Sequence, residues 1–206
     1  MNDPFERARR ATHWPLTGPA RRRFLHLGVR HGAGLGAVAA LPVLVLPARS
    51  RAALLSQPPD RDLAMHHLHT RERIDVLYAR HDRYLPDALG SLDHFLRDHY
   101  SGEVGTIDPR LHDLLHAVRR VLGTERRYEV ISGYRAPATN ANLKATRGGG
   151  VATRSLHMDG RAIDVRLPGV ALADLRDAAW SLQAGGVGYY PRDNFVHIDT
   201  GRVRRW

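Results

Sequence analysis

Three residues in the C-terminal half of the chain have the side chains and spacing of a metal centre. His157 and Asp164 lie seven positions apart across Gly160, which permits a turn between them, and His197 lies in an apolar, β-branched run. Two imidazoles and one carboxylate can hold a zinc ion and leave one coordination position open for water. That arrangement is typical of a zinc hydrolase. The pattern therefore predicts a zinc site at His157, Asp164 and His197.

The segments around these residues predict the strands that carry them. Asp164 lies in the middle of a strand over residues 161–166, in which polar and apolar residues alternate. A buried carboxylate there needs a partner, and a metal ion is one. His197 and Asp199 share one face of a final strand over residues 195–199, because successive side chains alternate in a strand. A lone strand histidine is more often a core residue, but the set of three favours a metal.

The rest of the chain alternates between short strands and helices without regular βαβ spacing. We expect an α+β fold, in which a small, mostly antiparallel sheet carries the site and is flanked by helices. Further strands are expected over residues 63–70, 74–78 and 128–132, and residues 185–190 are expected to form a turn that leads into a strand. Helices are expected over residues 85–99, 109–122 and 172–183, with a helical turn or more over residues 140–144.

Other histidines offer weaker metal sites. Three occur in the strand predicted over residues 63–70, where a structural role is the simpler interpretation. His112 and His116 have an i, i+4 spacing that can bind zinc on a helix. Asp113, however, replaces the Glu of a His-Glu-x-x-His motif. We assign all five histidines to structural roles.

The composition fits one folded domain plus an extension. The 206 residues are 43% apolar and 25% charged, and cysteine is absent, which excludes disulfides and thiolate zinc sites. The net charge of +10 suggests a polyanionic partner at first sight. Residues 1–52, however, carry nine Arg against Asp3 and Glu6, a net of +7, which leaves +3 for the remainder. We therefore expect no nucleic-acid partner.

The first 52 residues have the pattern of an export leader. Arg21 and Arg22 precede an apolar run of Gly, Ala, Leu and Val over residues 32–46, as in a twin-arginine signal. The run is short for a membrane span of ~20 residues. We expect residues 1–52 to be a leader read by the twin-arginine translocase, and residues 53–206 to act in the periplasm or cell envelope. A retained membrane anchor and a buried apolar helix are the alternatives.

Longer stretches around the three candidate ligands resemble one peptidase family. Ser155, His157, Gly160, Ala162 and Asp164 form the set Ser-x-His-x-x-Gly-x-Ala-x-Asp, which is similar to the zinc-binding signature of the M15 D-Ala-D-Ala peptidases. The resemblance is closest to their murein endopeptidase K-like branch and covers roughly residues 60–206. Further segments that carry it are residues 132–135, 139–140, 185–190, 195–201 and 203–206.

This resemblance implies a zinc peptidase that hydrolyses the peptide bond joining two stem peptides of peptidoglycan. His157, Asp164 and His197 would be its zinc ligands, in a hedgehog/D,D-peptidase-like zinc fold. Arg135 would bind the scissile carbonyl or the substrate carboxylate, and Ser155 is also assigned to substrate binding. A D,D-carboxypeptidase that trims terminal D-Ala, and a non-catalytic zinc-containing module that binds the cell wall, are the alternatives.

The sequence departs from the family at the catalytic base. Several M15 enzymes carry a Glu three residues before the last His, and Asn194 occupies that position here. Asp193 and Asp199 are the remaining carboxylates nearby. Asp199 points the same way as His197 along its strand, so we expect it to act as the base or as the partner that orients His197.

Overall fold

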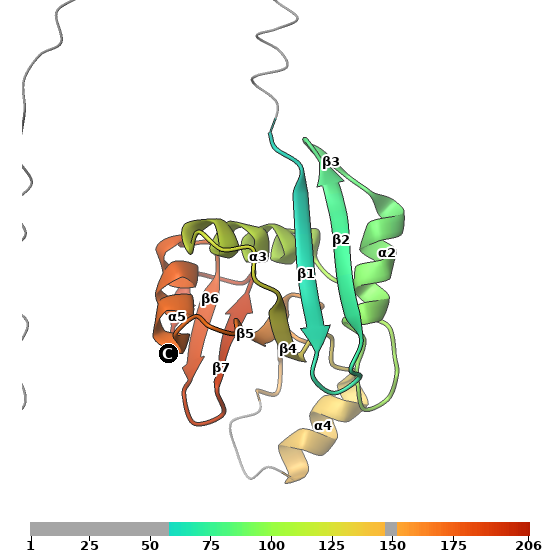
Figure 1. Cartoon of the computed structure of the whole chain (residues 1–206). Helices are drawn as coiled ribbons and strands as arrows, with labels where there is room; N and C mark the ends of the chain where they lie inside the picture. Colours follow the sequence, from blue (N-terminus) through green and yellow to red (C-terminus); the bar gives the residue numbers. More distant parts are fainter. Residues whose placement is uncertain (1–57, 147–151) are drawn as a thin grey trace, which may run out of the picture. The chain divides into compact units, whose positions relative to one another are not determined.

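The computed structural model describes residues 58–146 and 152–206, and the leader predicted over residues 1–52 lies outside them. Within the described ranges no helix is long and apolar enough to cross a bilayer. This part of the chain forms eight strands and four helices (Figure 1). The strands are β1 (Arg61–His67), β2 (Arg73–Arg80), β3 (Arg83–Tyr84), β4 (Tyr128–Ser132), β5 (Ala162–Arg166), β6 (Gly186–Tyr190), β7 (Phe195–Asp199) and β8 (Arg204–Arg205). The helices are α2 (Pro86–Phe95), α3 (Pro109–Val121), α4 (Pro137–Thr146) and α5 (Leu172–Ser181).

All eight strands belong to one sheet, in the order β3-β2-β1-β4-β5-β7-β6-β8. Neighbouring strands run antiparallel except at β1–β4 and β6–β8, where they are parallel. The predicted α+β class with a mostly antiparallel sheet is therefore confirmed, but the sheet is mixed and larger than expected. The sequence analysis missed β3 and β8, because two residues are too few to show an alternating pattern.

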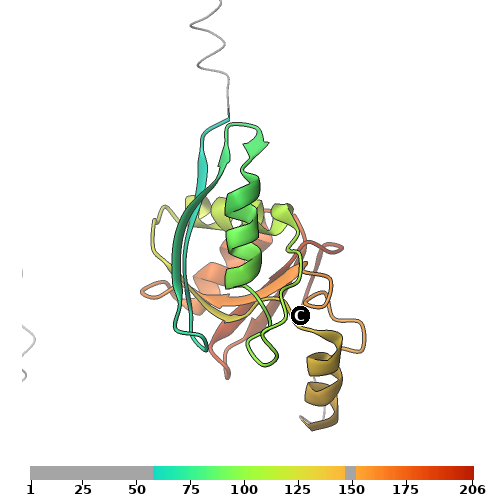
Figure 2. The same cartoon turned by 90° about the vertical axis from the view of Figure 1, so that its right-hand side faces the viewer.

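Three helices cover one face of this sheet and form the hydrophobic core with it. Helix α2 packs on β2, α3 on β1, and α5 on β6 and β7. Fully buried apolar residues supply the contact from both layers, among them Leu63, Leu92, Leu115, Val130, Ile163, Leu175 and Ile198. Helix α4 instead projects away from the sheet, as Figures 1 and 2 both show. The opposite face of β5 and β7 is thereby left for polar side chains.

Helix α3 begins where the sequence predicts, and its first turn is tied to the segment that precedes β5. Asp108 is the N-cap and accepts a hydrogen bond from the backbone N–H of Arg110, while Pro109 occupies the first turn. The backbone N–H of Asp108 also donates to the carbonyl of Gly160, at 2.9 Å. The start of the helix and the turn at Gly160 are thus joined directly.

Strand β1 is shorter than predicted. It ends at His67, and residues 68–70 form a turn before β2 begins. The His67 side chain stabilises this turn, because its Nδ1 accepts a hydrogen bond from the backbone N–H of His69 at 3.2 Å. Arg71 completes the turn with a left-handed φ of 65°. The strand predicted over residues 63–70 is therefore wrong at its C-terminal end, because His69 lies in the turn and not in the strand.

An irregularity in β4 directs the end of this strand towards the polar face of the sheet. Val130 pairs with Val165 of β5, but Ser132, two residues later, pairs with Asp164, one residue earlier. This extra residue on β4 is a β-bulge, and a bulge changes the face to which the following side chain points. Ser132 therefore lies beside Asp164, and the chain that follows it runs past the polar face.

Replacing Gly160 should destabilise the protein strongly. Its φ is +63°, and an added Cβ would lie 1.9 Å from the carbonyl oxygen of Thr106. We expect Gly160→Ala to lower the free energy of unfolding by at least about 2 kcal/mol, measured by urea denaturation. Gly90→Ala is the matched control: a Cβ there meets nothing within 4 Å, and alanine within a helix should stabilise by about 0.5–1 kcal/mol. Equal stability of the two variants would contradict the prediction.

Because of His112, the free energy of unfolding should fall as the solution becomes more acidic. It is fully buried beside Tyr78, neither ring nitrogen has a partner among the described residues, and burial lowers its pKa to about 4. Because the unfolded chain takes up this proton near pH 6.5, stability should fall between about pH 6.5 and 4, by up to about 3 kcal/mol.

Urea denaturation at pH 7 and pH 4.5 measures this loss. His112→Leu should reduce it, whereas His94→Leu, at an exposed position of α2, should leave it unchanged. His67, whose pKa burial also lowers to about 4, should contribute a similar part that remains in both variants. An identical acid dependence in His112→Leu and the wild type would contradict the prediction.

Candidate metal centre

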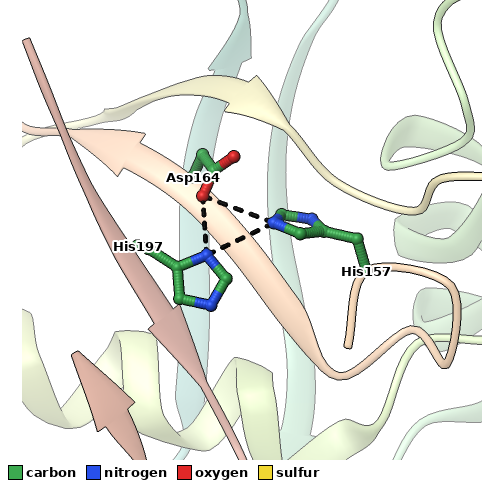
Figure 3. Close-up of side chains that lie close together, drawn as sticks. All are labelled: His157, Asp164 and His197. Carbon is green, nitrogen blue, oxygen red and sulfur yellow. Dashed lines mark hydrogen bonds and ion pairs between the residues drawn. The ribbon is translucent and has the colours of Figure 1, made fainter. Parts of the chain in front are cut away.

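The three predicted ligands come together on the polar face of the sheet (Figure 3). Nε2 of His157 lies 3.3 Å from Nδ1 of His197 and 3.4 Å from Oδ1 of Asp164. Nδ1 of His197 lies 2.8 Å from the same Asp164 oxygen. Among the described residues, this is the group of His, Asp and Glu side chains whose ligand atoms could hold a metal ion.

Strand register brings two of the ligands together. Asp164 of β5 pairs directly with His197 of β7 in the antiparallel ladder. Directly paired residues point to the same face with neighbouring Cβ atoms. Ile163 and Val165 flank Asp164 and point into the core, which explains how a carboxylate is carried by an otherwise apolar strand.

A tight turn brings the third ligand back over β5. The backbone N–H groups of Met158 and Gly160 donate to the carbonyls of Ser155 and His157. Gly160, which the sequence analysis expects to permit this turn, takes a left-handed conformation with a φ of 63°. The turn is also held from outside, because the backbone N–H of Arg135 donates to the His157 carbonyl at 3.1 Å.

Both imidazoles are held from behind by hydrogen bonds. Nδ1 of His157 lies 2.7 Å from the backbone carbonyl of Gly133, which therefore accepts its N–H and leaves Nε2 directed towards the group. Nε2 of His197 lies 3.2 Å from Oδ2 of Asp199, which leaves Nδ1 facing the other two ligands. Such outer hydrogen bonds fix the tautomer and orientation of metal-binding histidines.

Asp199 is engaged on both oxygens. Oδ1 accepts from the backbone N–H groups of Gly186 and Gly201, and the guanidinium of Arg204 donates to both oxygens. The side chain is fully buried, and it lies on the side of the His197 ring away from the other ligands. Of the two roles that the sequence left open for Asp199, this geometry favours the partner that orients His197.

The charges of the group attract a cation. Burial disfavours the charged forms of Asp164 and His197, but their interaction outweighs this cost. Asp164 and Asp199 raise the pKa of His197 to about 9, and the two histidines hold the pKa of Asp164 well below its usual range. A proton and a divalent metal ion satisfy the same attraction, so the two would compete for the group.

The donor set fits zinc. Two imidazole nitrogens and one carboxylate oxygen lie within 4.8 Å of one another, which is close enough for a single ion to contact all three. Zinc accepts this combination of ligands, and three protein donors leave a position for water or substrate. Among the residues that the structure describes, the other histidines form no such group: His112 is buried in the core, and His116 bonds the carbonyl of Asp62.

Arg135, which the resemblance assigns to substrate binding, lies beside the group. Its guanidinium is 4.0 Å from Oδ2 of Asp164 and bonds Oγ of Ser132 and Oδ1 of Asn140, at 3.5 and 3.4 Å. The buried carboxylate of Asp98 fixes the segment by accepting the backbone N–H of Ala136. The arginine is therefore positioned at the edge of the metal group.

An open cleft of about 620 Å³ lies over these residues. Ser155, which was assigned to substrate binding, lines this cleft, and Asp193 lines it from the turn between β6 and β7. A smaller hollow of about 80 Å³ adjoins it at Arg135 and Asp164 and extends to Tyr100. The metal group thus lies where two hollows meet.

Apart from Asp199, sequence reasoning missed the residues that support the ligands. The carbonyl of Gly133 has no sequence signal, since every residue carries one. The Arg204 clamp on Asp199 and the cleft residue Trp206 had a signal: both belong to the segment 203–206 that carries the resemblance. The sequence analysis assigns no function to residues 203–206, because the two-residue strand β8 is too short to predict.

Comparison with known proteins identifies the family of the chain. Residues 56–206 match the profile of the Peptidase_M15_2 family, described as peptidoglycan L,D-endopeptidase MepK. The chain belongs to this family.

The peptidoglycan L,D-endopeptidase MepK of Escherichia coli K12 is 45% identical over 186 residues, which cover 90% of this chain and 96% of the relative. The probable peptidoglycan L,D-endopeptidase MepK of Haemophilus influenzae is 38% identical, over 90% of this chain and 95% of its own. No solved structure matches the chain. The resemblance to the murein endopeptidase K-like branch is therefore confirmed.

Removing the charge of Asp199 should weaken metal binding. The amide of Asp199→Asn offers one acceptor where the carboxylate oxygens take five hydrogen bonds, so His197 should lose its fixed orientation. We expect about a 10- to 100-fold loss of zinc affinity, measured by competition with a chelator of known affinity. Asp193→Asn is the matched control. Asp193 lines the same cleft but contacts neither Asp199 nor the ligands in any hydrogen bond described above, so this variant should bind zinc as the wild type does. Unchanged zinc affinity in Asp199→Asn would show that the buried carboxylate does not orient the ligand.

Proposed function

We propose that this protein hydrolyses peptide cross-links of peptidoglycan with one zinc ion held by His157, Asp164 and His197. That it is a peptidoglycan endopeptidase follows from its family. The convergence of the three ligands in an open cleft is the observation that supports zinc catalysis. The name of the relatives leads us to propose the L,D linkage as the bond cleaved.

The three ligands would hold a zinc ion that activates the water that attacks the peptide bond. When bound, zinc lowers the pKa of a coordinated water towards about 7 and polarises a carbonyl oxygen. The chain's contribution is to hold the ligands ready: Gly133 and Asp199 orient the imidazoles from behind, so little rearrangement is needed when substrate enters.

Arg135 is proposed to stabilise charge on the substrate. It lies at the edge of the metal group and lines both hollows of the cleft, so a carbonyl or carboxylate oxygen near the ligands would lie within its reach. Removal of one hydrogen-bond donor from an oxyanion hole costs about 3–4 kcal/mol, and Arg135 would act as a donor of this kind. Ser155, on the cleft wall, is proposed to contact the stem peptide.

We propose that Asp199 orients His197 and does not itself take up a proton. Its two oxygens already accept hydrogen bonds from Gly186, Gly201, Arg204 and His197. Asp193 is the other carboxylate that lines the larger hollow beside the ligand Asp164, so it is the candidate proton acceptor.

Two hollows favour an endopeptidase over the D,D-carboxypeptidase alternative. An endopeptidase must accommodate chain on both sides of the scissile bond, whereas a carboxypeptidase needs one terminal residue on one side. The larger hollow reaches Trp206, the smaller one reaches Tyr100, and both contain Asp164. The binding-module alternative predicts neither turnover nor a need for an open coordination position.

We propose an envelope location and export by the twin-arginine translocase, with residues 1–52 as leader and residues 53–206 as the zinc peptidase domain. The alignment with the Escherichia coli relative covers 90% of this chain, more than residues 56–206 alone, so it includes part of the predicted leader. Peptidoglycan, the substrate named for the relatives, lies in the envelope. We also propose that the domain has the hedgehog/D,D-peptidase-like zinc fold.

Digestion of purified sacculi tests the proposed function. The wild type should convert cross-linked stem-peptide dimers to monomers, which mass spectrometry of the soluble products detects. His157→Ala should be inactive because one ligand is lost, and a chelator should stop the wild type until zinc is restored. Release of free alanine without loss of dimers would instead identify a carboxypeptidase. One bound zinc with neither product would favour the binding module.

A further inference from the structure

One row of residues crosses the polar face of the sheet through the metal group. Ser132 pairs with Asp164, Asp164 with His197, and His197 with Gly188. The row continues to Trp206, whose backbone N–H donates to the carbonyl of Val187 and whose carbonyl accepts from Tyr189. Trp206 therefore stands next to Gly188 on the face that carries the ligands.

Gly188 leaves room for the Trp206 ring to lie across the row. A Cβ at Gly188 would be 2.8 Å from atoms of both the Trp206 and Tyr190 rings. The Trp206 ring lies 5.4 Å from the ring of His197, with the guanidinium of Arg204 4.8 Å from its centroid. The indole is about half exposed and lines the cleft, so it forms a wall beside the ligands.

Two contacts fix the side chain of Tyr190 in this cleft. Its ring stacks on Phe195, with centroids 4.6 Å apart and planes 18° from parallel. Its hydroxyl oxygen accepts a hydrogen bond of 2.7 Å from Nε1 of Trp206. Both neighbours line the cleft with Tyr190, so the hydroxyl is held at the cleft wall.

The direction of this hydrogen bond determines what Tyr190 can offer. An indole N–H can only donate, so the tyrosine oxygen must accept and its own hydrogen remains available. Among the described residues no acceptor takes that hydrogen. The Trp206–Tyr190 pair thus presents one O–H donor to whatever occupies the cleft.

We propose that Tyr190 is a substrate-binding residue whose hydroxyl donates a hydrogen bond to an acceptor oxygen of the bound stem peptide, with Trp206 as its positioning residue. The inference rests on the proposed function, since it names a contact within the same cleft. The acceptor is a peptide carbonyl or a stem-peptide carboxylate, because both are common oxygen acceptors in peptidoglycan peptides.

A double-mutant cycle on the full chain tests this contact. Tyr190→Phe keeps the stacked ring and removes only the hydroxyl, so kcat/KM for stem-peptide dimers should fall about 10- to 100-fold. Trp206→Phe keeps a ring and removes the N–H, and should cause a smaller loss. The double variant should be no worse than Tyr190→Phe, because Trp206 acts through the hydroxyl.

Tyr189→Phe is the matched control. Tyr189 is the neighbouring tyrosine of β6, but it packs against the core and its ring lies under Arg176 rather than in the cleft. Its activity should equal that of the wild type. Zinc content and Tm are measured for every variant, so that a loss of metal or of folding is not mistaken for a lost substrate contact.

Binding separates failure of this inference from failure of the proposed function. The affinity of an uncleaved dimer is measured on His157→Ala protein with and without Tyr190→Phe, which requires no turnover. Weaker binding with the second change supports the contact even if sacculi are not digested. Wild-type kcat/KM and unchanged dimer affinity in the Tyr190→Phe variants, or additive losses in the double-mutant cycle, would overturn it.

Amidated substrates identify the acceptor. If the Tyr190→Phe loss is smaller with dimers whose stem-peptide carboxylates are amidated, the acceptor is a carboxylate, because its charged oxygen accepts a stronger hydrogen bond than the amide oxygen that replaces it. If the loss is the same for both substrates, the acceptor is a peptide carbonyl. Each result supports the proposed contact and assigns it to one group.

Discussion

The metal group depends on the pairing of β5 with β7. Antiparallel register places Asp164 opposite His197, and the same register places Ile163 and Ile198 together in the core. A slip by one residue would exchange the two faces of the strand, because side chains alternate with a period of two. The hydrophobic core therefore fixes the register, and the register brings the ligands together. The position of a polar site is in this way determined by apolar packing on the other side of the sheet.

A second layer of contacts determines how the ligands point. His157 is held by a backbone carbonyl, whereas His197 is held by a buried carboxylate that is itself clamped by Arg204. A buried carboxylate without partners would be costly, so the backbone N–H groups and the guanidinium are needed to keep Asp199 charged. Burial opposes its ionisation, but its hydrogen bonds hold the pKa of Asp199 well below its usual range. The fold thus keeps the Asp199 carboxylate next to His197 ionised without a bound ion.

The sequence was most informative where chemistry and pattern coincide. His157, Asp164 and His197 could be predicted from residue types and spacing, and the α+β class from the alternation of strands and helices. The ends of elements were harder. Strand β1 stops at His67 because a side-chain hydrogen bond to the turn replaces the next ladder bond, which the alternating pattern does not reveal. The two-residue strand β8 forms only because β6 offers it an edge, so its place depends on tertiary structure.

The hydrogen bond between Asp108 and Gly160 links the metal centre to the helical layer. The first turn of α3 and the turn that carries His157 are joined at that bond, so opening either one exposes the other. An ion bound by His157 would therefore resist fraying of the helix start, and chain segments that contribute no ligand would open more slowly when the ion is present. A bound ion would in this way stabilise the local fold in addition to its proposed part in the reaction.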